Sequence, residues 1–185
     1  EVAEKFFEYL LRRYPDYTPG YLARSHMYLQ MEDTTRAMAD LDTAIVNDPY
    51  TVQSFSARGL LYFHQQEFNR ALSDLDEAIR LDPYQQANYI NRGLVKYHLN
   101  DLRGAMADYD RVIEMDENNL IARFNRGLLR AQVADNNRAI RDFDKVIELE
   151  PDNTIAYLNR AMLNQEIGNY TGAIEDLNVV LEAHP

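Results

Sequence analysis

Residues 120–153 read LIARFNRGLLRAQVADNNRAIRDFDKVIELEPDN, and this 34-residue stretch decides the fold. The same pattern recurs, with the same spacing, at residues 18–51, 52–85, 86–119 and 154–185. Residues 1–17 match the second half of one more copy. A fixed period of this length is typical of a stack of small units that pack only on their neighbours. We therefore expect a single repeat domain over residues 1–185, and, because it begins in mid-repeat, a fragment of a longer protein.

Each copy predicts a pair of α-helices, with its residues counted as positions 1 to 34. Positions 1–14 and 18–30 carry apolar residues at three- and four-residue spacing, which indicates two amphipathic helices. A short polar turn such as Gly168-Asn169 separates them. Position 32 ends the second helix, because a residue before proline is pushed out of helical geometry. Its occupants are Pro49, Pro83, Glu117, Pro151 and Pro185. With the preceding half copy, the expectation is an all-α protein of about 11 helices.

Small residues recur where the two helices of a copy should touch. In an antiparallel hairpin, positions 8 and 20 lie at the same height, so that Gly or Ala at both allows a close approach of the helices. Position 8 holds Ser25, Gly59, Gly93, Gly127 and Ala161, and position 20 holds Ala37, Ala71, Ala105, Ala139 and Ala173.

Every complete copy also carries an arginine at position 7 and an aspartate at position 23. The pairs are Arg24 and Asp40, Arg58 and Asp74, Arg92 and Asp108, Arg126 and Asp142, and Arg160 and Asp176. Both members should lie level across the hairpin, where the guanidinium can bind the carboxylate with two hydrogen bonds. We interpret them as structural ion pairs. The alternative is a ladder of arginines for anionic ligands. A second aspartate recurs at position 25 and should face a neighbouring repeat or solvent.

The small-residue, aromatic and proline positions resemble the tetratricopeptide repeat family over the whole chain. The resemblance implies a right-handed superhelical solenoid of antiparallel hairpins whose first helices line a concave face. It also implies a protein or peptide as partner. The chain departs from the family in three places. Position 7 is always Arg where the family often has Leu, Arg123 replaces the aromatic residue of position 4, and Glu117 replaces proline.

The first-helix stripe, which we define as positions 2, 6, 9 and 13, is the expected ligand surface under this resemblance. Three successive copies place Asn at position 6, and an amide can pair with a peptide backbone without reading its side chains. The pattern resembles the asparagine ladder in the repeat domain of O-linked N-acetylglucosamine transferase. The alternative is a solvated amide or one bonded to an adjacent helix. The expected peptide-binding residues are Asn91, Asn125, Asn159, Leu94, Leu128, Met162, His64, His98 and Gln132.

Two smaller features carry alternatives of their own. Lys96, Arg123 and Arg130 could bind a carboxylate of a partner. Alternatively, Arg123 and Arg130 could pair locally with acids of the preceding helix, such as Asp110 or Glu114. His64 and His98 share position 13 in adjacent copies, but no Cys or Asp accompanies them on the stripe. We therefore expect exposed histidines and no metal site.

Composition and motifs narrow the function further. The net charge of −11 disfavours nucleic acid and anionic membranes, whose phosphates need clustered Lys and Arg. The chain has no Cys, and no apolar run is long enough to cross a membrane. No signal peptide is visible, so the sequence does not indicate a cellular compartment. The style of the repeats favours a bacterial source. No catalytic or cofactor-binding motif occurs, and we expect no enzyme activity and no cofactor.

The sequence thus predicts a scaffold or adaptor that binds an extended peptide. Two alternatives remain. One is a module that forms a homodimer through its last helix, where Val179, Val180 and Leu181 lie and where no capping helix follows. The other is the substrate-binding arm of a larger enzyme.

Overall fold

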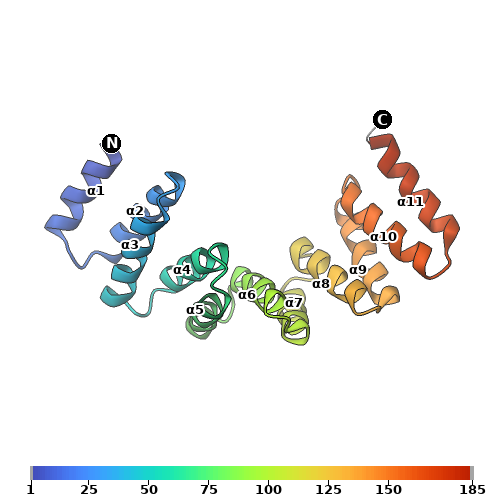
Figure 1. Cartoon of the computed structure of the whole chain (residues 1–185), viewed down its shortest axis with the longest axis horizontal. Helices are drawn as coiled ribbons and strands as arrows, with labels where there is room; N and C mark the ends of the chain where they lie inside the picture. The colour runs from blue at the N-terminus through green and yellow to red at the C-terminus, as the bar shows by residue number, and fades with distance from the viewer. Residues whose placement is uncertain (1, 184–185) are drawn as a thin grey trace. The chain divides into compact units, whose positions relative to one another are not determined.

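The computed structural model describes residues 2–183, and within this range the chain forms eleven α-helices (Figure 1). This confirms the all-α prediction. Pro185, the last residue at position 32, lies outside the described residues. The helices are α1 (Val2–Arg13), α2 (Thr18–Gln30), α3 (Thr34–Asn47), α4 (Val52–His64), α5 (Phe68–Leu81), α6 (Gln86–His98), α7 (Leu102–Met115), α8 (Leu120–Gln132), α9 (Asn136–Leu149), α10 (Thr154–Glu166) and α11 (Tyr170–Ala183).

The helices follow the 34-residue period without a shift. Each first helix begins at position 1 and ends at position 13, as α8 does at Leu120 and Gln132. Each second helix begins at position 17, one residue earlier than predicted, as α9 does at Asn136. None of the helices described is long and apolar enough to cross a membrane.

The chain divides into two compact units between Asn100 and Asp101. In the first unit, which contains α1 to α6, Ala71 and Leu75 of α5 and Val95 of α6 form one fully buried cluster. In the second unit, which contains α7 to α11, the corresponding cluster includes Phe143 of α9 and Leu163 of α10. Each cluster thus joins a second helix to the first helix of the next repeat, and burial of these side chains drives the stacking.

Position 8 meets the second helix of its own repeat closely, as predicted. A Cβ atom added at Gly59 would lie 3.1 Å from Cγ of Leu75 and 3.4 Å from the carbonyl oxygen of Ala71. One added at Gly127 would lie 3.0 Å from Cζ of Phe143. At Gly59 and Gly127 the hairpins therefore leave little room for a side chain.

The turn that ends each repeat depends on the aspartate at position 31 as well as on proline. Asp48 and Asp82 precede prolines and have extended backbones. Asp116 has the same conformation before Glu117, with φ −148° and ψ 100°. Its Oδ1 accepts a hydrogen bond from the backbone N–H of Asn118 at 3.0 Å. This side-chain bond explains why the third repeat keeps its turn without proline.

The turn between the two helices of a repeat has one residue with positive φ, at position 15. Gly168 has φ +81°, but Ala134 has φ 59° at the same position of the preceding repeat. There the N–H of Asp135 bonds to the carbonyl of Arg130 at 2.8 Å, which closes the helix end. An alanine in this conformation is strained by its Cβ atom, and a glycine is not.

We expect Ala134→Gly to raise the free energy of unfolding by about 1 kcal/mol, because it removes the strain of a left-handed alanine. Gly168→Ala, the reverse change at the equivalent position, should lower it by a similar amount. Urea unfolding followed by circular dichroism measures both. A loss of stability in Ala134→Gly would contradict this description of the turn.

Candidate functional site

The arginine of position 7 binds the aspartate of position 23 in its own hairpin. Arg58 Nε lies 2.8 Å from Asp74 Oδ2, and its Nη2 lies 2.8 Å from Asp74 Oδ1. The same two-bond geometry joins Arg24 to Asp40, Arg126 to Asp142 and Arg160 to Asp176. The predicted pair of Arg92 with Asp108 has one member in each unit and stays a prediction.

The remaining guanidinium nitrogen reaches the preceding repeat. Nη1 of Arg58 lies 2.7 Å from Oδ1 of Asp42, which occupies position 25. The equivalent bonds are Arg92 to Asp76, Arg126 to Asp110 and Arg160 to Asp144, each at 2.7 Å. The second aspartate of each repeat thus binds the arginine of the next repeat. One side chain therefore ties together three helices from two repeats.

Burial and aromatic neighbours complete the surroundings of these arginines. Burial lowers the pKa of Arg126, but its bonds to Asp142 and Asp110 outweigh this effect and raise the pKa. The guanidinium of Arg58 also lies over the rings of Phe55 and Tyr62, with centroids 5.9 and 5.8 Å away. Because its N–H groups and faces are used inside the fold, we interpret this arginine as scaffold and not as part of a ligand ladder.

The fourth repeat gathers three arginines on one buried carboxylate. Nη1 of Arg130 lies 2.7 Å from Asp142 Oδ2, and Nη1 of Arg123 lies 3.7 Å from Asp142 Oδ1. The local partner is therefore the aspartate of the following helix, and the expected pairing with Asp110 or Glu114 is wrong. Asp110 is bound by Arg126. Lys96 is half-buried in α6, in the first unit.

Arg123 also makes a bond that the tyrosine at the same position makes in the third repeat. In the third repeat, the hydroxyl of Tyr89 donates to the carbonyl of Pro83, six residues earlier, at 3.2 Å. In the fourth repeat, Nε of Arg123 donates to the carbonyl of Glu117, also six residues earlier, at 2.6 Å. The departures at Glu117 of the third repeat and Arg123 of the fourth are thus coupled, because the arginine binds the turn in which proline is missing. We leave Arg123 and Arg130 out of the proposed ligand contacts, since both are bound within the fold.

The first-helix stripe of the second unit borders an apolar pocket. This pocket, of about 480 Å³, has Phe124 and Val146 among its lining residues and Asn125 at the polar edge. Two exposed isoleucines at position 2, Ile121 and Ile155, lie on either side. Leu128 and Met162 at position 9 are exposed on the same two helices, as is Gln132 at position 13.

A smaller pocket of about 200 Å³ lies on the stripe of the first unit. Leu60 and His64 of α4 and Asn91 and Leu94 of α6 line it, over the buried Val95. The stripe residues predicted from sequence are therefore brought together here in pairs from adjacent repeats.

The two histidines of position 13 both contact Phe63. Its ring centroid lies 5.7 Å from that of His64 and 5.3 Å from that of His98. The ring of His98 also stacks on Phe68 at 4.9 Å. Among residues 2–183, no group of three or more metal-ligating side chains could hold an ion.

The three asparagines of position 6 differ in what their amides bind. Within the described residues, the side-chain amides of Asn91 and Asn125 make no hydrogen bond, and both residues are half-buried. Asn159 donates through Nδ2 to the carbonyl of Ile155 in its own helix at 2.8 Å. Two amides are thus available in full for a ligand, and the third keeps its oxygen and one of its two N–H groups.

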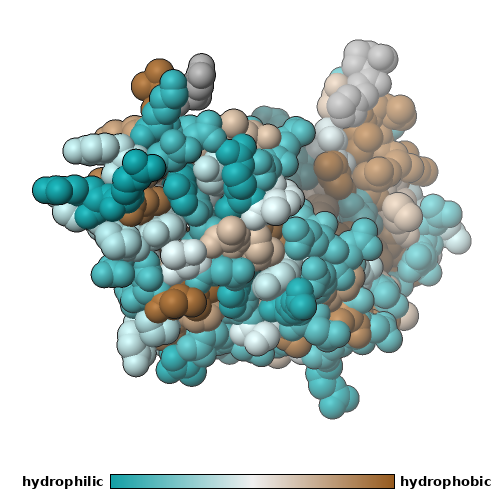
Figure 2. Space-filling model, turned by 60° about the vertical axis from the view of Figure 1, so that its left-hand side comes forward, coloured by the Kyte–Doolittle hydropathy of each residue, from teal (hydrophilic) through white to brown (hydrophobic). Residues whose placement is uncertain are grey.

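The last helix, α11, has an exposed apolar stripe, but it does not include Val179 and Val180, which were expected there from the sequence. Val179 and Val180 are half-buried, whereas Leu181 is 65% exposed. The exposed members recur at three- and four-residue spacing and are Tyr170, Ile174, Leu177 and Leu181. Figure 2 shows hydrophobic surface on the part of the molecule that the C-terminal helices form.

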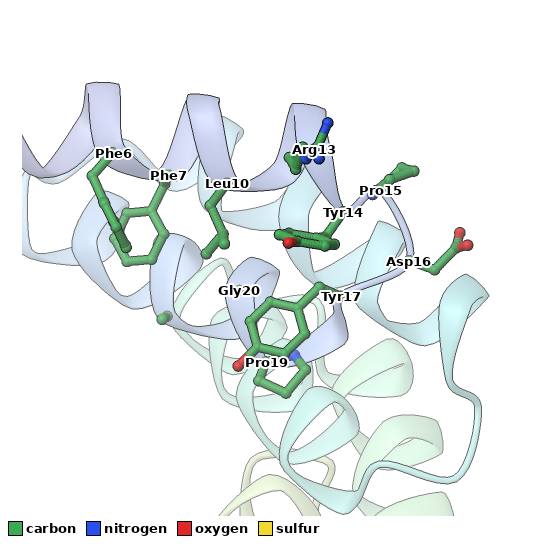
Figure 3. A pocket seen from close by; sticks show the side chains of 11 residues that line it. Phe6, Phe7, Leu10, Arg13, Tyr14, Pro15, Asp16, Tyr17, Pro19 and Gly20 are labelled. Carbon is green, nitrogen blue, oxygen red and sulfur yellow. The ribbon is translucent and has the colours of Figure 1, made fainter.

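A cavity of about 800 Å³ lies between α1 and α2 and was not predicted. Aromatic side chains of α1 and of the loop after it provide much of its lining (Figure 3). The sequence did hold a signal for it, because Phe6, which lines the cavity, stands at position 23, where every complete copy has an aspartate.

Comparison with known families and structures agrees with this arrangement. Models of the tetratricopeptide repeat match residues 52–85, 87–119 and 126–185. No match was found among curated proteins.

Several solved structures have a similar fold. YrrB, described as a TPR protein with an unusual peptide-binding site, is 21% identical with a TM-score of 0.82, over 97% of this chain and 92% of its own. MamA from Desulfovibrio magneticus RS-1 is 16% identical with a TM-score of 0.83, over 90% of this chain and 94% of its own. A tetratricopeptide repeat protein from Parabacteroides merdae is 21% identical with a TM-score of 0.81, over 98% of this chain and 72% of its own. At these identities the likeness concerns the fold alone.

The two carboxylates bound by Arg58 should contribute unequally to stability. Asp74→Ala leaves a largely buried guanidinium without its two-bond partner, and we expect the free energy of unfolding to fall by about 3 kcal/mol. Asp42→Ala removes one bond to a half-exposed acid and should cost less than about 1 kcal/mol. Chemical unfolding of both variants gives the comparison. Equal losses of stability in the two variants would contradict the interpretation that Arg58 binds Asp74 strongly within the hairpin and Asp42 more weakly between repeats.

Proposed function

The chain belongs to the tetratricopeptide repeat family, and we propose from this premise that it is a non-catalytic scaffold that binds an extended segment of a partner protein. The first-helix stripe is the proposed binding surface. The segment would lie along the stripe, with its backbone against the asparagines and its apolar side chains in the pockets beside them.

The observation that carries the proposal is the coincidence of an unbonded amide with an apolar pocket. Asn125 borders a pocket of about 480 Å³, and Asn91 borders one of about 200 Å³. An amide that makes no bond within the fold can donate to and accept from a peptide backbone at once. The adjacent pocket can take a side chain of the same peptide, which is how extended peptides are commonly recognised.

The exposed residues of the stripe support the same occupant. Ile121, Ile155 and Met162 are 57–61% exposed in the second unit. Exposed aliphatic side chains flanked by amides favour a segment with apolar residues at intervals. Glu150 also lines the larger pocket, and the net charge is −11, so a basic residue in the segment would be favoured over an acidic one.

A second candidate function is self-association through α11. The exposed stripe of Tyr170, Ile174, Leu177 and Leu181 supports it, because contiguous apolar surface of this kind commonly marks an interface. Position 25 holds Asn178 there instead of aspartate. A neutral amide can face its own copy across a two-fold axis, whereas an aspartate would face a like charge.

We expect the simultaneous change of Asn91, Asn125 and Asn159 to Ala to weaken peptide binding at least about tenfold, at roughly 1 kcal/mol for each backbone hydrogen bond. The probes are peptides selected against the chain from a random library, and calorimetry measures the affinity. Asn137→Ala, an exposed asparagine of α9, is the control. Of the single changes, Asn159→Ala should have the smallest effect, since its N–H already bonds to Ile155. Unchanged affinity in the triple variant would remove the basis of the proposal.

If α11 mediates self-association, Leu181→Glu should convert a dimer into a monomer in sedimentation velocity experiments. Because Leu181 is exposed, this change should not prevent folding. Val46→Glu, which places the same charge at another exposed apolar position, should leave the dimer intact. A monomeric wild-type chain at about 100 μM would exclude this second function at physiological concentrations.

A further inference from the structure

Glu150 differs from its equivalents in how its side chain relates to the turn after its helix. It occupies position 31, where the three preceding repeats have an aspartate. Oδ1 of each aspartate accepts a hydrogen bond at 3.0 Å from the backbone N–H two residues later, which stabilises the turn. These bonds join Asp48 to Tyr50, Asp82 to Tyr84 and Asp116 to Asn118. Among residues 2–183, Glu150 accepts no bond of this kind, so its carboxylate is not used to close the turn.

Asn153 fixes this carboxylate instead. Its Nδ2 donates to Oε2 of Glu150 at 3.0 Å, and its Oδ1 accepts from the N–H of Ala156 at 3.0 Å as the cap of α10. Because the amide is bonded at both ends, it holds Glu150 at a defined position relative to α10. Oε1 of Glu150 accepts no hydrogen bond from the described residues, and the residue is exposed. One carboxylate oxygen is therefore open to a ligand.

The open oxygen belongs to a residue that borders the larger pocket of the first-helix stripe, of about 480 Å³. Phe124 and Val146 are among the apolar residues that line this pocket, and Glu150 is the one charged residue among the described residues of its lining. Val146 is in the last turn of α9, and the C-terminal end of a helix carries a partial negative charge. The pocket thus combines apolar walls with negative charge at one side.

These features fit a side chain with a long apolar stem and a positive end. Lysine and arginine both have this form, and both can bury their methylene groups while the charge stays near water. Arginine binds a carboxylate best through two parallel bonds, one to each oxygen. Oε2 of Glu150 already accepts from Asn153, whereas the compact ammonium of lysine needs only Oε1. The geometry therefore favours lysine over arginine.

We propose that the larger pocket binds the side chain of a lysine, with its methylene groups against Phe124 and Val146 and its ammonium at Oε1 of Glu150. This lysine belongs to the segment proposed to lie along the first-helix stripe, so its recognition rests on that function and adds a residue type to it. The smaller pocket, in the first unit, has no carboxylate among its described lining residues, and an apolar side chain is expected there.

The probes are peptides selected against the whole chain from a random library, and calorimetry measures their affinities. Each lysine of a selected peptide is replaced in turn by norleucine, which keeps the apolar stem and removes the charge. In the protein, Glu150→Gln removes the charge but can still accept a bond from Asn153. Glu150→Asp keeps the charge and should direct it into the turn, as at Asp82. Glu148→Gln, which removes an exposed carboxylate two residues earlier in α9, is the control.

We expect one lysine of each peptide whose replacement by norleucine weakens binding to the wild-type chain at least about fivefold. Glu150→Gln should weaken binding of the unchanged peptide to the same extent and make the norleucine replacement neutral. Glu150→Asp should have the same effect as Glu150→Gln, because the shorter side chain does not reach the pocket. Glu148→Gln should change the affinity less than about twofold. Both positions are exposed, so the variants should fold, and circular dichroism verifies this.

The outcomes separate this proposal from the function on which it rests. Selected peptides without lysine, or peptides whose affinity depends on Asn125 but not on Glu150, would overturn the lysine pocket and leave the proposed function intact. An effect of Glu148→Gln equal to that of Glu150→Gln would also overturn it, because general attraction to an acidic chain would then explain the preference. Peptides that need Glu150 and their lysine but not the three asparagines would support the pocket and overturn the proposed function. A library that yields no binding peptide would overturn both.

Discussion

The bond between an arginine and two aspartates from successive repeats is the interaction on which the rest of the structure depends. Within a hairpin, Arg126 fixes the height of α8 against α9 through Asp142. Between repeats, its remaining nitrogen binds Asp110 of α7. Since each repeat contacts only its neighbours, the bonds of this kind at Arg58, Arg126 and Arg160 set the geometry of the stack locally. Charge-assisted bonds with fixed direction suit this purpose better than apolar contacts, which have none.

This use of arginine separates scaffold from surface within a single helix. Position 7 turns inward to the second helices, and position 6 carries an amide at the edge of a pocket. Adjacent residues thus differ in role, because successive residues of a helix point about 100° apart. The stack can keep its geometry while the stripe varies from repeat to repeat, as the change from Ala57 to Asn91 at position 6 illustrates.

Much of the fold could be predicted from the sequence, because each position of a repeat can be compared with the equivalent positions of the other copies. The helices, the close approach at Gly59 and the pairing of Arg58 with Asp74 all follow from the spacing of residues along one hairpin. The partner of position 25 could not be derived, because it lies in another repeat whose placement depends on packing. The partner of Arg130 was expected in the preceding helix, whereas it is Asp142 of the second helix in its own repeat.

The turns and the ends of the chain were harder to predict. Positive φ at Ala134 has no marker in the residue type, although Gly168 and Asn100 at the equivalent positions hint at it. The cavity between α1 and α2 was missed because it forms between helices of successive copies, which the spacing of residues within one copy does not describe.

The central claim, that arginine serves the scaffold and the asparagine before it serves the ligand, can be tested on two adjacent residues. Arg126→Ala and Asn125→Ala are compared in both stability and affinity for a selected peptide. We predict that Arg126→Ala lowers the free energy of unfolding by about 3 kcal/mol and leaves the affinity of the folded protein unchanged. Asn125→Ala should weaken binding about fivefold at nearly constant stability. The reverse pattern, with lost affinity in Arg126→Ala and lost stability in Asn125→Ala, would contradict the claim.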